Sequence, residues 1–266
     1  METRLHQQLK ERYRQPDSEV EVRLDRFRID VVNGNRLVEI QRSGLSTIKK
    51  KSIILLDNGF ELDVVKPVVY RKRLVKLKSA KGKVIERRWS PKRGCIWDIF
   101  DELIHFTEVF PHPNLQLLIP IISIVETRYP GHGRRRRKRT GDFVVKDRAI
   151  LEFHDTFNFA GIGDLQGMLP ENLPCEFDTL DLAQSLQKPR HEAQKIAYVM
   201  KKMGAITTIG KRGRSWLYRL CHPLEIAKFN QITSASKKKR AIRKIQQALS
   251  EHRRRAQSQA PRRAAG

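Results

Sequence analysis

The sequence predicts an α/β or α+β fold, followed by a smaller unit of helices and a short ribbon. Three observations support this prediction. Apolar residues in the first third of the chain switch between helical spacing and the alternation typical of strands. Residues 115–125 are nearly all aliphatic, as expected of a strand buried on both faces. From residue 179 onward, two amphipathic segments precede two short strands. At 266 residues, the chain is long enough for two domains.

We expect the first domain to span residues 1–129. Apolar stripes predict helices, and alternating or β-branched runs predict strands. The expected elements, in order, are a helix over 5–13, a strand over 19–24, a hairpin over 26–41, a helix from Ser46 or Thr47 to 57, a strand over 60–69 with a kink or a sheet edge at Pro67, a basic hairpin over 71–89, a helix over 96–109 and a strand over 115–125. This alternation of helices with strands predicts helices packed against one sheet.

The hairpin over 26–41 is centred on the Asn-Gly-Asn turn at 33–35, because Asn and Gly accept the positive φ that tight reversals need. If Gly and the second Asn form the loop, Asp30 lies directly opposite Glu39. If the first Asn and Gly form it, the two acids are diagonal neighbours on the same face. Gln41 shares that face in either register. The opposite face is expected to be apolar and to carry Ile29, Val31, Val38 and Ile40.

Asp30 and Glu39 form a pair of like charges on neighbouring strands, with Cβ atoms roughly 5 Å apart, and such pairs destabilise a sheet by up to about 1 kcal/mol. A bound cation would convert this cost into a binding site. The helix over 5–13 could supply a third carboxylate, and Glu11 is our candidate. The alternative for Glu11 is a solvated side chain on the outer face of that helix.

The spacing of Asp30, eight residues and then Glu39-Ile40-Gln41 resembles the core motif of the PD-(D/E)xK nuclease superfamily. Asp30 matches the first acid, Glu39 the second acid, Gln41 the position usually held by lysine, and Glu11 the acid of the first helix. The resemblance covers roughly residues 1–129 and implies a restriction-endonuclease-like fold.

That resemblance implies phosphodiester hydrolysis assisted by Mg²⁺ or Mn²⁺. The metal ligands would be Asp30, Glu39 and the backbone carbonyl of Ile40. Gln41 would hold water or the scissile phosphate, and Lys49, Lys50 or Lys51 could return a cation to the site. Two alternatives remain: a nuclease-like domain without catalysis, and an unrelated sheet with a solvated carboxylate face.

Residues 130–141 are rich in Gly and Arg and contain six consecutive cations at 134–139, so we expect either a flexible hinge or a basic arm. Residues 142–159 fit two short strands or a strand and a helix. The segment 142–230 is then predicted to be a winged helix-turn-helix domain, because a helix from Thr179, a helix over 190–203 and a ribbon over 205–220 follow one another.

The second of these helices would be the recognition helix, and its early exposed residues are the candidates for DNA contact together with the cationic tip of the ribbon. The predicted DNA-binding residues are Arg190, His191, Gln194, Lys195, Lys211, Arg212 and Arg214. Winged helices also serve as protein-binding modules, which is the alternative for this unit.

A formal net charge of +25 favours a polyanionic partner, and double-stranded DNA is our first choice over RNA or an anionic membrane. The tail over 231–266 is basic, with an expected helix over 241–252 and a disordered end. The sequence contains no signal-peptide-like start and no apolar run long enough to span a membrane. We therefore expect a cytoplasmic protein, associated with the nucleoid if bacterial.

These observations predict a metal-dependent DNA endonuclease that a winged helix recruits to DNA. The second hypothesis is a DNA-binding regulator or architectural protein without enzymatic activity. RNA or ribosome association, which rests on charge alone, is the third.

Overall fold

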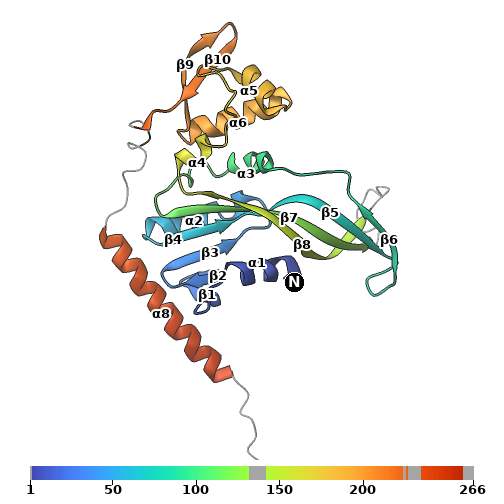
Figure 1. The fold of residues 1–266 in the computed structure, drawn as a ribbon. Coiled ribbons are helices and arrows are strands. Elements are labelled where there is room, and N and C mark those ends of the chain that lie inside the picture. Colours follow the sequence, from blue (N-terminus) through green and yellow to red (C-terminus); the bar gives the residue numbers. More distant parts are fainter. Residues whose placement is uncertain (1, 132–141, 224–225, 227–234, 260–266) are drawn as a thin grey trace, which may run out of the picture.

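The computed structural model describes residues 2–131, 142–223, 226 and 235–259, and it is a mixed α/β structure built on a large mixed sheet (Figure 1). The sheet has the order β1-β2-β3-β4-β7-β5-β6, and β8 pairs with β7 outside this path. Its strands are β1 (Glu19–Leu24), β2 (Phe27–Asn33), β3 (Arg36–Ile40), β4 (Glu61–Val65), β5 (Val68–Leu77), β6 (Val84–Trp89), β7 (Leu115–Pro130) and β8 (Phe143–Phe159). The separate ribbon consists of β9 (Ile206–Arg212) and β10 (Ser215–Leu220).

The helices follow the predicted order, with differences in length. They are α1 (Arg4–Tyr13), η1 (Leu45–Thr47), α2 (Lys49–Asp57), η2 (Ile96–Ile99), α3 (Phe100–Leu103), α4 (Ile162–Gln166), α5 (Thr179–Leu186), α6 (Arg190–Lys202) and α8 (Ala235–Gln259). The helix predicted over 96–109 is shorter, because it is a 3-10 turn followed by one α-helical turn. Pro67 divides the strand predicted over 60–69 into β4 and β5, since proline cannot donate to a sheet ladder.

The hairpin of β2 and β3 has the first of the two predicted registers. Val31 pairs with Val38 and Asn33 with Arg36, so Gly34 and Asn35 form the loop. Gly34 has a φ of 57°, the left-handed conformation that glycine adopts without strain. Strand β3 then runs parallel to β4, and α2 provides the crossover between them.

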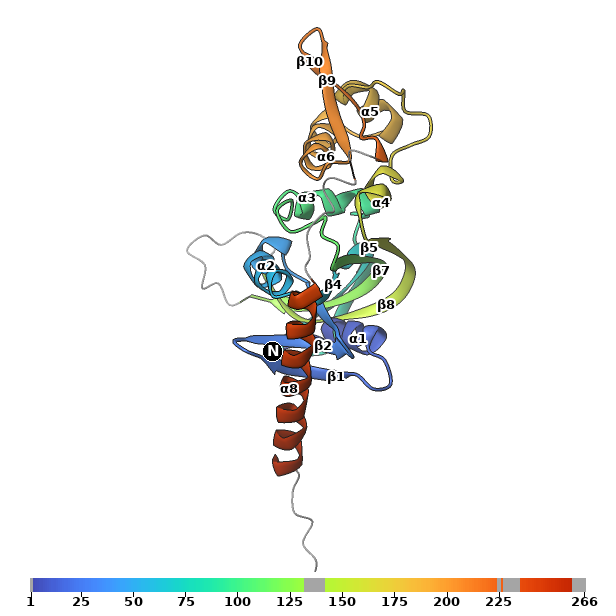
Figure 2. The same cartoon turned by 90° about the vertical axis from the view of Figure 1, so that its left-hand side faces the viewer.

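Helices α1 and α2 lie on opposite sides of the sheet (Figure 1, Figure 2), and each covers its own apolar cluster. The predicted apolar face of the hairpin is correct for Val31, Val38 and Ile40, which pack with α1. It is wrong for Ile29, which belongs to the larger cluster on the other side. Glu21, on the neighbouring strand β1, has a φ of 58°, which interrupts the strand alternation beside Asp30.

The predicted domain border at residue 129 is wrong. Strand β8 pairs antiparallel with β7 along its whole length, from Pro130 with Phe143 to Leu117 with Phe159. Residues 143–159 therefore complete the large sheet, and the second unit begins after them. The run of cations at 134–139 lies outside the described residues. A Gly- and Arg-rich segment can join paired strands as readily as two domains, so its composition was an ambiguous signal.

The second unit contains α4, α5, α6 and the β9–β10 ribbon, in the predicted order of helix, turn, helix and ribbon. Helix α5 begins at Thr179, as predicted, and Asp178 caps it by accepting hydrogen bonds from Leu180 N at 2.6 Å and Asp181 N at 3.1 Å. Phe177, just before this cap, pairs antiparallel with Tyr218 of β10. The segment before α5 is thereby attached to the ribbon.

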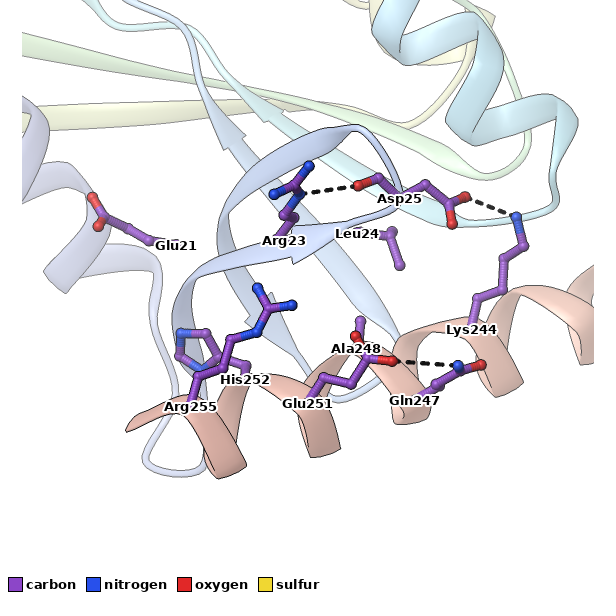
Figure 3. A pocket seen from close by; sticks show the side chains of 10 residues that line it. All are labelled: Glu21, Arg23, Leu24, Asp25, Lys244, Gln247, Ala248, Glu251, His252 and Arg255. Atoms are coloured by element: carbon purple, nitrogen blue, oxygen red, sulfur yellow. Dashed lines mark hydrogen bonds and ion pairs between the residues drawn. The ribbon is translucent and has the colours of Figure 1, made fainter. Parts of the chain in front are cut away.

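Helix α8 is longer than predicted and packs along β1, at the edge of the large sheet (Figure 1). Ile245 and Ala248 are buried, and Lys244 Nζ contacts Asp25 Oδ2 at 2.8 Å beside a hollow of about 370 Å³ (Figure 3). Glu19 of β1 pairs with His252 at 2.9 Å and with Arg253. The helix thus covers an edge strand that would otherwise expose its backbone. No helix among the described residues is long and apolar enough to cross a bilayer.

We predict that Glu19→Gln loosens α8 without unfolding the sheet, because Glu19 contacts the His252 ring and the Arg253 guanidinium of that helix. Partly exposed ion pairs contribute up to about 1 kcal/mol each, so amide hydrogen exchange in α8 should accelerate by about 2- to 5-fold. Exchange in β7 should not change. Arg254→Gln, which alters an exposed residue of the same helix, is the matched control. Unchanged exchange of α8 in Glu19→Gln would contradict this account of its docking.

Candidate active site

The two predicted acids lie where β2 and β3 separate. The backbone pairing of β2 with β3 ends at Val31 and Val38, one position before Asp30 and Glu39. Beyond this point, Asp30 Oδ2 accepts a hydrogen bond from Ile40 N at 2.8 Å. The side-chain carboxylate thus takes the role that a backbone carbonyl of the partner strand would have. Both acids line one hollow of about 450 Å³. Its other lining residues are His6, Ile40, Gln41, Arg42, Ser43 and Arg148.

Asp30 is held in its ionised form. Burial disfavours its charge, but the nearby His6 and the Ile40 N–H favour it more strongly, so the pKa of Asp30 lies below its usual value. His6 Nε2 lies 3.3 Å from Asp30 Oδ2, and His6 Nδ1 lies 3.1 Å from Glu2 Oε1. The histidine therefore bridges two acids, one from the start of the chain and one from β2.

Glu39 has the opposite behaviour. Its residue is only 6% exposed, and burial raises the pKa of Glu39 to about 7 despite the ion pair with Lys51. Lys51 reaches it from α2 and also donates to the carbonyl of Arg28 at 2.5 Å. Of the three lysines predicted as substitutes for the missing motif lysine, Lys51 is the one that meets Glu39. Lys49 pairs with Glu108 instead, at 2.6 Å.

Gln41 faces the loop that follows β3. Its Nε2 donates to Ser43 Oγ at 2.8 Å and to Gly44 O at 2.7 Å, and it also contacts Thr47 Oγ1. The amide nitrogen, which we expected to hold water or a phosphate, is therefore committed to fixing this loop. The side chain still lines the hollow.

The buried Lys66 and the half-buried Glu102, which the sequence did not single out, secure the same loop. Lys66 Nζ donates to Ser43 O at 2.7 Å and lies 3.1 Å from Glu102 Oε1. Glu102 in turn accepts from Leu45 N at 2.8 Å. The sequence around Lys66 and around Glu102 gives no indication that the two side chains meet, because they lie far apart in the chain and belong to different parts of the fold.

Glu11, predicted to be the acid of the first helix, lies outside the hollow. Its side chain is 73% exposed and pairs with Arg14 at 3.1 Å. Helix α1 contributes His6 instead, one helical turn and more before Glu11. The signal that could have found it is the Glu2–His6 pair with i,i+4 spacing, which places both side chains on one face.

The donor set suits a hard cation that keeps water among its ligands. Among the described residues, no group of three or more His, Cys, Asp or Glu side chains could hold a metal ion. Two carboxylates, Asp30 and Glu39, line the hollow together with Ile40. Mg²⁺ is commonly bound by one or two carboxylates with the remaining positions filled by water or substrate, so these residues fit that ion.

The structure separates the predicted DNA-binding residues into different surfaces. Arg190, Gln194 and Arg214 line one hollow on α6 and the ribbon. His191 and Lys195 line another, which faces η2 and α3, and Lys195 pairs with Asp101 of α3. The remaining two residues lie on the ribbon: Lys211 Nζ lies 4.7 Å from the ring centroid of Trp216, and Arg212 pairs with Asp181 at 2.7 Å.

We predict that Glu39 weakens the fold as pH rises. Its pKa is 4.5 without the protein's influence and about 7 in the fold, so the folded state holds the proton more tightly. Deprotonation between these values lowers the free energy of unfolding by up to about 3 kcal/mol. Glu39→Gln should remove this loss. Urea unfolding at about pH 5 and about pH 8 measures it, and Glu11→Gln is the exposed control. A wild-type minus Glu39→Gln difference that does not vary with pH would contradict the prediction.

Comparisons with known proteins agree with the border observed in the fold. Residues 3–160 match a family model described as Domain of unknown function (DUF8091), and this match ends next to the last residue of β8. An uncharacterized protein of Treponema pallidum (strain Nichols) is 32% identical over 220 residues, which cover 82% of this chain and 85% of that protein. This alignment is longer than the family match, so it also includes part of the chain outside residues 3–160. No solved structure matches the chain.

The family model matches more than half of the chain, and the relative from Treponema exceeds 30% identity over most of both proteins. The chain therefore belongs to the family described as Domain of unknown function (DUF8091).

Proposed function

We propose that this protein is a metal-dependent nuclease that hydrolyses phosphodiester bonds in DNA, and that its second unit is a winged helix-turn-helix that recruits it to DNA. The observation that carries the proposal is the convergence of Asp30 and Glu39 on one hollow at the point where β2 and β3 separate. A buried carboxylate next to a second, half-buried one is costly, and a cation would offset that cost.

The strand order supports a PD-(D/E)xK-like interpretation. Helix α1 precedes the meander of β1, β2 and β3, and α2 then leads to β4, which is parallel to β3. This order of helix, meander, helix and parallel strand resembles the core of that superfamily, with the two acids on the second and third strands. The position of Lys51 supports this interpretation further. Gln41 stands where the motif usually has a lysine, and Lys51 places a cation beside Glu39 instead.

In this proposal, Mg²⁺ or Mn²⁺ is held by the carboxylates of Asp30 and Glu39 and the carbonyl of Ile40. Such an ion, when bound, polarises the phosphoryl group and lowers the pKa of water. The chain's own cations complete the site, since Arg42 and Arg148 line the same hollow and can bind the phosphate that is cleaved. Lys51 can stabilise the negative charge that develops there.

The second candidate function is a DNA-binding regulator or architectural protein without catalysis. One observation favours it: Lys51 already pairs with Glu39, and the Gln41 amide is bound within its loop. The site is thereby neutralised by residues of the chain, and it can persist as a structural element. Both functions place the protein on DNA, which in a bacterial cell means the cytoplasmic nucleoid.

The first test is cleavage of supercoiled plasmid with Mg²⁺ or Mn²⁺. Asp30→Ala and Glu39→Ala should each lose about 100-fold or more of the rate, because each removes several kcal/mol of charge stabilisation. Glu11→Gln is the matched control and should cleave like the wild type, since Glu11 lies outside the hollow. DNA affinity should be retained in all variants. Equal residual cleavage by every variant would reject the nuclease and leave the binding protein.

The second test concerns recruitment. Arg190→Ala with Arg214→Ala should weaken duplex DNA binding and reduce its salt dependence by about two units of slope, one for each lost phosphate contact. Lys195→Ala should have a smaller effect, because Lys195 pairs with Asp101. A gel shift over a series of salt concentrations measures both. No change in the double variant would point to a protein-binding role for this unit.

A further inference from the structure

The second unit has a hollow of about 320 Å³ between α6 and the ribbon, outside the candidate active site. Two large aromatic side chains in it are unusually open to solvent: Tyr198 is 49% exposed and Trp216 is 52% exposed. A single exposed ring is common on protein surfaces, whereas exposed aromatic rings gathered in one concave surface are typical of binding sites. Gln194 lies on the same helix as Tyr198 and also lines the hollow.

The charges around these rings have one sign. Arg190, Lys201 and Arg214 line the hollow, and its lining residues include no Asp or Glu. Lys201 Nζ lies 5.6 Å from the ring centroid of Trp216, and Lys211 Nζ lies 4.7 Å from it. Contact with a ring does not neutralise an ammonium group, so both lysines can still attract an anion. The hollow therefore combines a stacking surface with cations.

We propose that this hollow binds an unpaired nucleobase of single-stranded nucleic acid. The base would stack on Trp216, the neighbouring phosphates would contact Arg190 and Arg214, and the amide of Gln194 would hydrogen-bond to the base edge. This inference rests on the proposed recruitment of nucleic acid by the second unit, but it does not depend on cleavage.

An unpaired base fits better than a base in a duplex. The bases of a duplex are already stacked on one another, and extruding one costs a few kcal/mol. A single strand offers free faces, and each base stacked on an aromatic ring contributes a large share of the affinity. A purely phosphate-binding surface would need the arginines and lysines, but it would gain nothing from the exposed ring of Trp216. The inferred substrate class is therefore nucleic acid with a single-stranded segment.

The test uses the full-length protein in EDTA, so that cleavage plays no part. Binding of a fluorescein-labelled oligothymidylate is followed by anisotropy, and a duplex of equal length is the comparison. Trp216→Ala should weaken the affinity for the single strand by about 5- to 100-fold. The affinity for the duplex should fall by less than the square root of that factor, which is about 2- to 10-fold. Trp89→Ala is the matched control. Trp89 is 42% exposed on β6 and lies under Arg71, but it belongs to another surface.

Tryptophan fluorescence provides a second readout that a folding defect would not imitate. Unlabelled oligothymidylate should quench the wild type, and the quenching should be lost in Trp216→Phe while thermal unfolding stays unchanged. Polyglutamate should not produce this quenching. Unchanged single-strand affinity in Trp216→Ala, an equal loss for single strand and duplex, or equal quenching by polyglutamate would each overturn the proposal. Failure of plasmid cleavage would reject the nuclease and leave this proposal intact.

Discussion

The hydrogen bond from Ile40 N to Asp30 Oδ2 determines how the site is built, because it ends the pairing of β2 and β3 with a side chain. Once the strands separate, the backbone N–H of β3 needs a new acceptor, and an ionised carboxylate provides it. The same bond favours the charged form of Asp30. Burial is the main reason why the pKa of the neighbouring Glu39 is raised, and the negative charge of Asp30 raises it further. The surroundings therefore shift the pKa values of the two acids in opposite directions. Glu39 can exchange a proton near neutral pH, while Asp30 stays ionised.

The surroundings of this pair consist mostly of charged contacts that bring distant elements together. Lys51 connects α2 to Glu39. Lys66, directly after β4, and Glu102 of α3 hold the loop after β3. Each of these residues would be costly to bury alone, so the contacts are interdependent. Glu126 of β7 is similarly 3% exposed and lies between Lys72 at 3.1 Å and Arg148 at 2.9 Å. Because Arg148 also lines the hollow, the position of this arginine depends on a buried acid of the central strand.

Local signals in the sequence predicted the elements, while contacts between elements determined the site. The Asn-Gly-Asn turn located the hairpin but left two registers open, and the structure has the first of them. The aliphatic run over 115–125 identified β7, which also continues to Pro130. The choice of Lys51 among three adjacent lysines depends on how α2 is rotated against the sheet, which its weakly amphipathic sequence does not specify. The rotation of α1 against the sheet is likewise not specified by its sequence, which explains why Glu11 and not His6 was predicted as the contribution of this helix to the site. Lys195 and Asp101 are 94 residues apart, and no local pattern indicates that they meet.

The formal charge of +25 is a poor guide to where a polyanion would bind, because the cations have different partners. Arg36 contacts Glu61 at 3.0 Å and Asp63 at 2.6 Å, so its charge is largely compensated within the sheet. Lys201 and Lys211 instead lie against the ring of Trp216, and within the described part of the chain neither forms an ion pair with an acid. A cation that is both ordered and uncompensated loses less entropy when it meets a phosphate than one on a free side chain. In the proposed complex with nucleic acid, affinity should therefore be concentrated where cations lie against aromatic rings, and the number of basic residues matters less than the partners of each one.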